Sequence, residues 1–124
     1  MKRIDDEAGL AALRLASLAQ GTASEPKGPP DRETLALAVR WTLQRLAEQA
    51  PGHALEVRVP PYGAVQAIEG PRHTRGTPPN VVETDPATWL ALATGELAFS
   101  AALAAGRLQA SGTRTDLSGV LPLV

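Results

Sequence analysis

The dipeptide Asp85-Pro86 is the feature that most constrains how this chain of 124 residues folds. An aspartate can accept hydrogen bonds from the unpaired N–H groups at the start of a helix, and proline suits the first helical position because its missing N–H has no partner there. We therefore expect a helix to begin at Pro86 and to end at Gly95. Residues 80–84, directly before it, are predicted to form a strand.

Three further segments have the apolar patterns of strands. In residues 55–59 the apolar and charged side chains alternate, which is typical of a strand with one buried face. Residues 60–63 contain two prolines and a glycine and predict a turn. Residues 64–69 are apolar without alternation, as in a strand covered on both sides. Residues 107–113 alternate again and predict the last strand.

The remaining apolar residues recur at helical spacing. We expect one helix over Asp6–Gln20, a second that Asp31 caps and that ends before Pro51, and a short one that ends at Gly106. The apolar tail, residues 121–124, is expected to cover any face left open. Strands joined by short turns pair antiparallel, and the helices must cover an apolar sheet face, so the predicted fold class is α+β.

The breaker-rich stretch from Gly21 to Pro30 predicts a flexible connection, so we divide the chain into two parts. Residues 1–30 form an N-terminal helix with its connection, and residues 31–124 form the main domain. Trp41 lies partly outside the main apolar stripe of its helix. We expect it to meet the first helix, or otherwise a second subunit.

Composition and motifs exclude several functions. The formal net charge of -1 gives no general attraction to nucleic acid or an anionic membrane, and no apolar run is long enough to span a membrane. The two histidines lack the spacing of a metal site, and nucleotide-binding and serine-nucleophile motifs are absent. We therefore predict no metal, no cofactor and no enzymatic activity. With no cysteine and no apolar leader, the protein is expected in the cytoplasm.

Two segments of the C-terminal half carry a family resemblance. Residues 85–97 contain an acidic cap and then the pattern aromatic-Leu-x-Leu-x-x-Gly, and residues 101–112 contain Gly-Arg-Leu before a strand that ends on glycine. This arrangement resembles the C-terminal half of sterol-carrier-protein (SCP2-like) domains. Residues 55–66 and 70–83 look like the small stand-alone actinobacterial members of that family. The resemblance extends from about Asp31 to Val124.

The resemblance implies a curved, mostly antiparallel sheet of about four to five strands, covered on one side by helices. It also implies an apolar tunnel between the two layers that accepts a fatty acyl chain, a lipid or a similar molecule. In many members the tail after the last strand lines or lids the tunnel. Here the tail after Gly112 is short, so the size of the tunnel is open.

Two groups of residues are candidates for such a site. The first group consists of apolar side chains that would line the pocket or else simply fill the core: Val65, Ile68, Trp89, Leu92, Phe99 and Leu103. The second group would lie at a polar mouth and bind a carboxylate or phosphate head group, or else form a solvated loop: Arg72, His73 and Arg75.

The predicted function is therefore non-catalytic binding or carrying of a hydrophobic small molecule or lipid. The alternative is a protein-interaction module with a packed core that docks onto a partner enzyme or forms a homodimer. An enzyme that uses the loop around His73 on an anionic substrate is the least favoured hypothesis.

Overall fold

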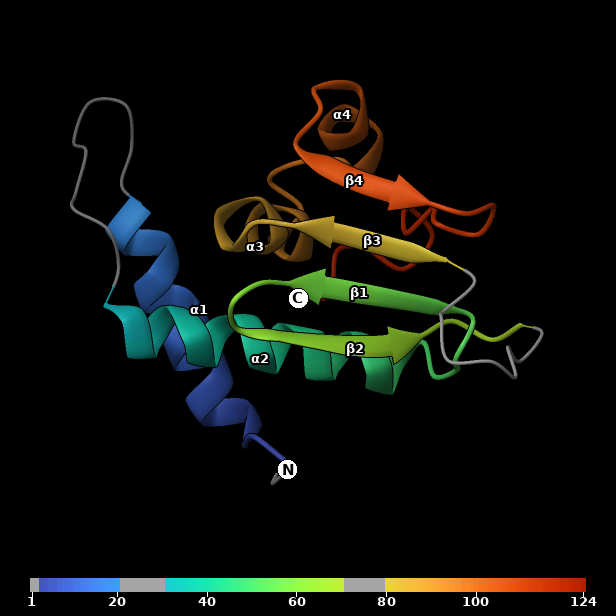
Figure 1. Ribbon diagram of the computed structural model, residues 1–124. Helices are drawn as coiled ribbons and strands as arrows, with labels where there is room; N and C mark the ends of the chain where they lie inside the picture. The colour runs from blue at the N-terminus through green and yellow to red at the C-terminus, as the bar shows by residue number, and fades with distance from the viewer. Residues whose placement is uncertain (1–2, 21–30, 71–79) are drawn as a thin grey trace.

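The computed structural model describes residues 3–20, 31–70 and 80–124. The predicted order of elements and the α+β class are confirmed (Figure 1). The described elements are α1 (Asp6–Gln20), α2 (Arg32–Gln49), β1 (Leu55–Val59), β2 (Gly63–Ala67), β3 (Val81–Thr84), α3 (Pro86–Thr94), α4 (Phe99–Ala104) and β4 (Leu108–Ser111).

The four described strands form one mixed sheet in the order β2-β1-β3-β4. The β1–β2 hairpin and the β3–β4 pair are antiparallel, as expected, whereas β1 and β3 run parallel at the centre. The parallel pair arises because β3 lies on the side of β1 opposite to β2. The buried amide of Asn80 stabilises this junction, since it donates to the Ala54 carbonyl at 2.7 Å and accepts from the Arg114 N–H at 3.0 Å.

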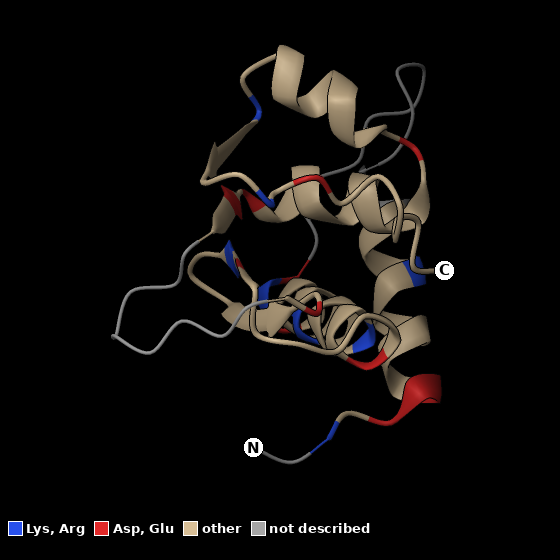
Figure 2. Ribbon diagram, turned by 90° about the vertical axis from the view of Figure 1, so that its right-hand side faces the viewer, with Lys and Arg blue, Asp and Glu red and all other residues tan. Residues whose placement is uncertain are grey.

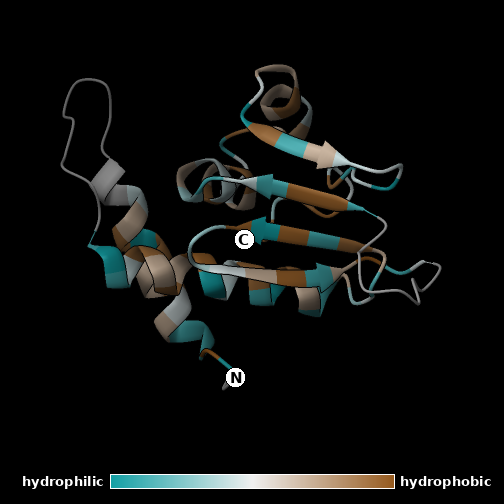
Figure 3. Ribbon diagram, viewed as in Figure 1, coloured by the Kyte–Doolittle hydropathy of each residue, from teal (hydrophilic) through white to brown (hydrophobic). Residues whose placement is uncertain are grey.

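The sheet has one apolar and one polar face. The expectation that residues 64–69 form a strand covered on both sides is therefore wrong, because β2 lies at the edge of the sheet and its Ala64 and Gln66 are exposed. In β1, residues Leu55, Val57 and Val59 are buried, and the intervening Glu56 and Arg58 form an ion pair on the other face. Figure 3 shows this alternation of hydropathy along the strand. Helices α2 and α3 lie on the apolar side, as the turned view in Figure 2 shows. The apolar side chains of strands and helices therefore share one core.

The sharpest sequence prediction, the start of α3, is confirmed in detail. The Asp85 carboxylate accepts from the Thr88 N–H at 3.0 Å, Pro86 begins the helix, and Gly95 closes it with φ +83°. Burial raises the pKa of Asp85, but the hydrogen bonds from Thr88 outweigh this effect and hold that pKa below its ordinary value. The cap is therefore charged at neutral pH and keeps its hydrogen bonds.

A buried hydrogen bond ties α3 to α2. Trp89 is fully buried, and its indole N–H donates to the hydroxyl oxygen of Thr42 at 2.8 Å. The Thr42 hydroxyl itself lies 2.8 Å from the Ala38 carbonyl and 2.9 Å from that of Val39. The one polar atom of the indole is therefore satisfied inside an otherwise apolar core.

Helix α1 packs on α2 at a close contact between Gly9 and Trp41. A Cβ atom at Gly9 would lie 2.0 Å from the Trp41 ring, so only glycine allows this approach. The Trp41 indole N–H donates to the Asp6 carboxylate at 3.1 Å, and the Arg45 guanidinium lies 5.6 Å from the ring centroid. The expectation that Trp41 meets the first helix is confirmed.

The C-terminal tail covers the helix side of the core, as expected. Leu117 and Leu123 are buried, whereas Val124 is 46% exposed. The Leu123 N–H donates to the Ala93 carbonyl at 2.8 Å, and the Leu123 carbonyl accepts from the Gln49 side chain at 3.1 Å. The tail is thus bound to both α3 and α2.

We expect Gly9→Ala to destabilise the protein by about 1–3 kcal/mol, because the added methyl overpacks the contact with Trp41. Urea denaturation followed by circular dichroism measures the change. Gly119→Ala is the control, because a Cβ there meets nothing within 4 Å. A gain of about 1 kcal/mol at Gly9, the helix-propensity effect alone, would contradict the packing argument.

We expect Thr42→Val to cost about 1–3 kcal/mol of unfolding free energy, because it leaves the buried Trp89 N–H without an acceptor. The control is Thr94→Val on α3, whose hydroxyl contacts only backbone carbonyls of its own helix. Equal losses from the two substitutions would show that the bond between the helices contributes nothing. The same denaturation assay compares them.

Candidate ligand-binding groove

An apolar groove of about 420 Å³ opens where α2 passes the edge strand β2. It therefore lies at the boundary between the helix layer and the sheet. Its floor and walls combine apolar side chains with the backbone of the β2 start: Ile4, Leu43, Ala47, Tyr62, Gly63, Ala64 and Val65. Four polar side chains complete the lining: Arg3, Arg40, Gln44 and Glu48.

Small residues open the groove where helix and strand approach each other. A Cβ atom at Gly63 would lie 3.4 Å from a methyl carbon of Leu43 and 3.8 Å from Cγ of Arg40. A longer side chain at Gly63 would therefore project against α2. Ala47 on the helix also ends at Cβ, so apolar surface stays uncovered between the two elements.

Arg40 gives the groove a cationic side. Its Nε donates to the Tyr62 carbonyl at 2.9 Å, which fixes the guanidinium beside the turn before β2. Within the part of the chain that the structure describes, Arg40 has no carboxylate partner within 4.0 Å. A guanidinium in this position can bind a carboxylate or a phosphate.

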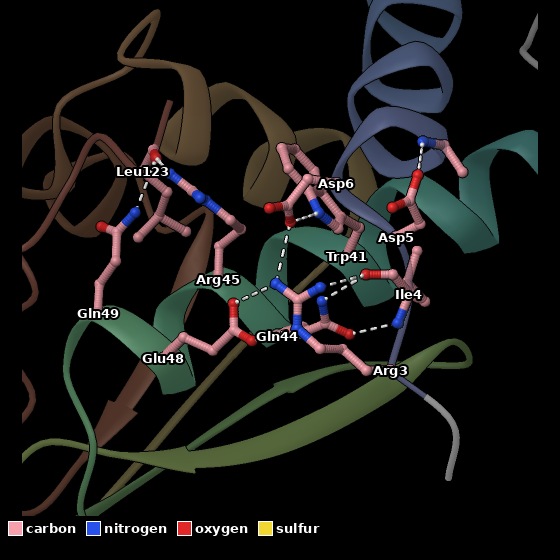
Figure 4. Close-up of polar contacts among 11 residues, drawn as sticks. Arg3, Ile4, Asp5, Asp6, Trp41, Gln44, Arg45, Glu48, Gln49 and Leu123 are labelled. Carbon is pink, nitrogen blue, oxygen red and sulfur yellow. Dashed lines mark hydrogen bonds and ion pairs between the residues drawn. The ribbon is translucent and has the colours of Figure 1, made fainter.

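The N-terminal residues Arg3 and Ile4, here called the N-terminal strap, form another wall of the groove. Figure 4 shows these two residues beside Gln44 and Glu48 of α2. The Gln44 side chain accepts from the Ile4 N–H and donates to the Ile4 carbonyl, both at 2.8 Å. Arg3 pairs with Glu48 at 2.7 Å and with Asp6 at 3.1 Å. The hydrogen bond from Trp41 lowers the pKa of Asp6, so this carboxylate is charged at neutral pH.

The structure places most of the predicted apolar pocket residues in or against the core. Trp89, Leu92 and Phe99 are at most 5% exposed, and Val65 and Ile68 pack against the same cluster from the sheet side. Of these residues, Val65 also lines the groove. Leu103 lies apart, with 47% of its side chain exposed on α4.

The three residues of the predicted polar mouth, Arg72, His73 and Arg75, lie outside the described residues. Within the described residues, no cluster of three or more histidine or acidic side chains could hold a metal ion. None of the described helices combines the length and apolar character needed to cross a bilayer.

Sequence reasoning missed the polar lining of the groove on α2. Arg40, Leu43, Gln44 and Ala47 follow one another at helical spacing and form a stripe beside the core-facing one. The groove could have been indicated by this second helical stripe, which contains both apolar and polar residues. The strand that follows the helix starts with Gly-Ala, which is part of the same pattern.

Comparison with known proteins identifies the family. The model of a family described as bacterial SCP ortholog matches residues 31–123, and no curated protein matches the chain. Domains of this kind are in general non-catalytic carriers that bind lipids. The match takes in most of the chain and agrees with the resemblance found in the sequence. The chain therefore belongs to the family of bacterial sterol carrier protein orthologues.

Proposed function

We propose that this protein is a non-catalytic carrier that binds a fatty acyl chain or a similar amphiphile, with the apolar tail in the groove between α2 and β2. The observation that carries the proposal is the apolar space of about 420 Å³ at the boundary between the sheet and the helices. This volume falls within the range of about 300–1,000 Å³ that is usual for small-molecule sites. Membership of a family of lipid carriers supports the same conclusion.

The floor of the groove suits a hydrocarbon tail. Leu43 lines it and also belongs to the core cluster, so the floor is a continuation of the core rather than a separate patch. A tail lying along the partly exposed Ala47 and Val65 would gain about 25 cal/mol for each Å² of apolar surface removed from water. No side chain of the core has to move for this contact.

Arg40 orients the ligand in this proposal. An amphiphile with its tail on the floor would bring an anionic head group to the guanidinium at the rim. A polar mouth formed by Arg72, His73 and Arg75 stays a separate prediction, because these residues are outside the described part of the chain.

A deeper site around Trp89, Leu92 and Phe99 also stays a prediction. A ligand that reached these three residues would have to displace tightly packed side chains and break apolar contacts. Binding in the groove does not require packed core side chains to be displaced. We therefore place the tail in the groove rather than at the deeper site.

We expect Ala47→Trp to weaken binding of a pyrene-labelled dodecanoic acid by about tenfold or more, because the indole fills the groove. Fluorescence titration measures the affinity. Ala101→Trp, the same change on the exposed face of α4, is the control. If Ala47→Trp binds as well as the unaltered protein, the tail lies elsewhere. If the unaltered protein binds no acyl probe, the protein-interaction hypothesis replaces the carrier.

We expect Arg40→Gln to weaken binding of the labelled acid by about fivefold and to leave binding of the corresponding uncharged alcohol nearly unchanged. The reason is that only the acid presents a carboxylate to the guanidinium. Arg14→Gln on α1 is the control, because Arg14 is exposed and is not among the groove residues. Equal losses for acid and alcohol would show that Arg40 shapes the groove without binding the head group.

A further inference from the structure

We propose that the N-terminal strap, Arg3-Ile4, is a displaceable lid that competes with the ligand tail for the floor of the groove. This inference rests on the proposed function, because it assigns the control of ligand uptake to the same site. It concerns a segment outside residues 31–123, the part of the chain that the family model matches.

The strap lies where a ligand tail would bind. Arg3 and Ile4 both line the groove, and the partly buried Ile4 side chain packs against the core. Ile4 therefore covers apolar surface that a hydrocarbon tail could cover instead. When a hydrocarbon tail replaces Ile4, the total apolar surface that is buried changes little. A ligand can therefore displace the strap at a small cost in free energy.

The strap is attached to the rest of the protein by weak interactions. The side chains of the Arg3–Glu48 pair are 53% and 40% exposed, and those of the Arg3–Asp6 pair are 53% and 56% exposed. Exposed pairs of this kind contribute about 0–1 kcal/mol each. The two bonds between Gln44 and the Ile4 backbone contribute about 1 kcal/mol each. Opening the strap is therefore a small, local event.

Helix α1 is anchored independently of the strap. Gly9 lies against the Trp41 ring, and Leu13 and Ala16 are buried. Asp5 caps the helix, since its carbonyl accepts from the Gly9 N–H at 2.9 Å. The strap can therefore move about a hinge at Asp5 while α1 stays on α2.

The test replaces Ile4 and measures how fast the pyrene-labelled acid binds. If the strap must open before the tail binds, the apparent affinity equals the intrinsic affinity multiplied by the fraction of molecules with an open strap. A more weakly attached strap raises this fraction and therefore the apparent affinity. We expect Ile4→Ser to raise the association rate and the affinity by about fivefold. Leu15→Ser, which changes a 57% exposed leucine on α1 outside the groove, should leave both values unchanged.

A second measurement addresses the ion pair and uses the uncharged pyrenyl alcohol, so that salt does not act on the ligand's charge. High salt screens the exposed Arg3–Glu48 pair, and we expect the association rate of the unaltered protein to rise with salt. Glu48→Gln should start at the higher rate and lose the greater part of the salt dependence, because only the Arg3–Asp6 pair remains. Glu33→Gln, on an exposed residue of the same helix, should retain it.

The outcomes separate the two proposals. If Ala47→Trp blocks binding while Ile4→Ser binds at an unchanged or lower rate, the strap is a fixed wall and the lid is refuted, but the carrier stands. If the unaltered protein binds neither probe, both proposals are refuted. Far-ultraviolet circular dichroism of each variant confirms that the comparison is made on folded protein.

Discussion

The hydrogen bond between the Trp89 indole and Thr42 fixes how the helix layer lies on the sheet. It joins the most buried aromatic ring to the middle of α2, and so sets the position of that helix relative to α3. Leu43 follows Thr42 directly, and its side chain serves both the core and the floor of the groove. The shape of the groove therefore depends on a contact that lies on the other side of α2 from the groove.

Local patterns in the sequence predicted the elements well because their causes are local. The Asp85 cap, the alternation in β1 and the closing Gly95 each act within a few residues. The parallel pairing of β1 with β3 could not be predicted in the same way. It depends on contacts such as the one between Asn80 and Ala54, which are far apart in the sequence and show no periodicity.

In the candidate site, too, the features with local causes could be predicted and those that depend on distant residues could not. Helical spacing predicted that Trp89 and Leu92 face inward, and both are buried. Spacing alone does not distinguish a face that packs tightly from one that borders a space. The groove arises from the small residues at Gly63 and Ala47, which are distant in sequence and meet only in the folded chain.

Helix α2 holds both ends of the described chain within two turns. The Glu48 carboxylate accepts a hydrogen bond from Arg3, and the Gln44 side chain accepts one from the Ile4 N–H (Figure 4). The side chains of Arg45 and Gln49 donate to the Leu123 carbonyl. A purification tag joined ahead of Arg3 would therefore start beside the groove and crowd its opening. A fusion that spares the site needs a long, polar linker at whichever terminus carries it.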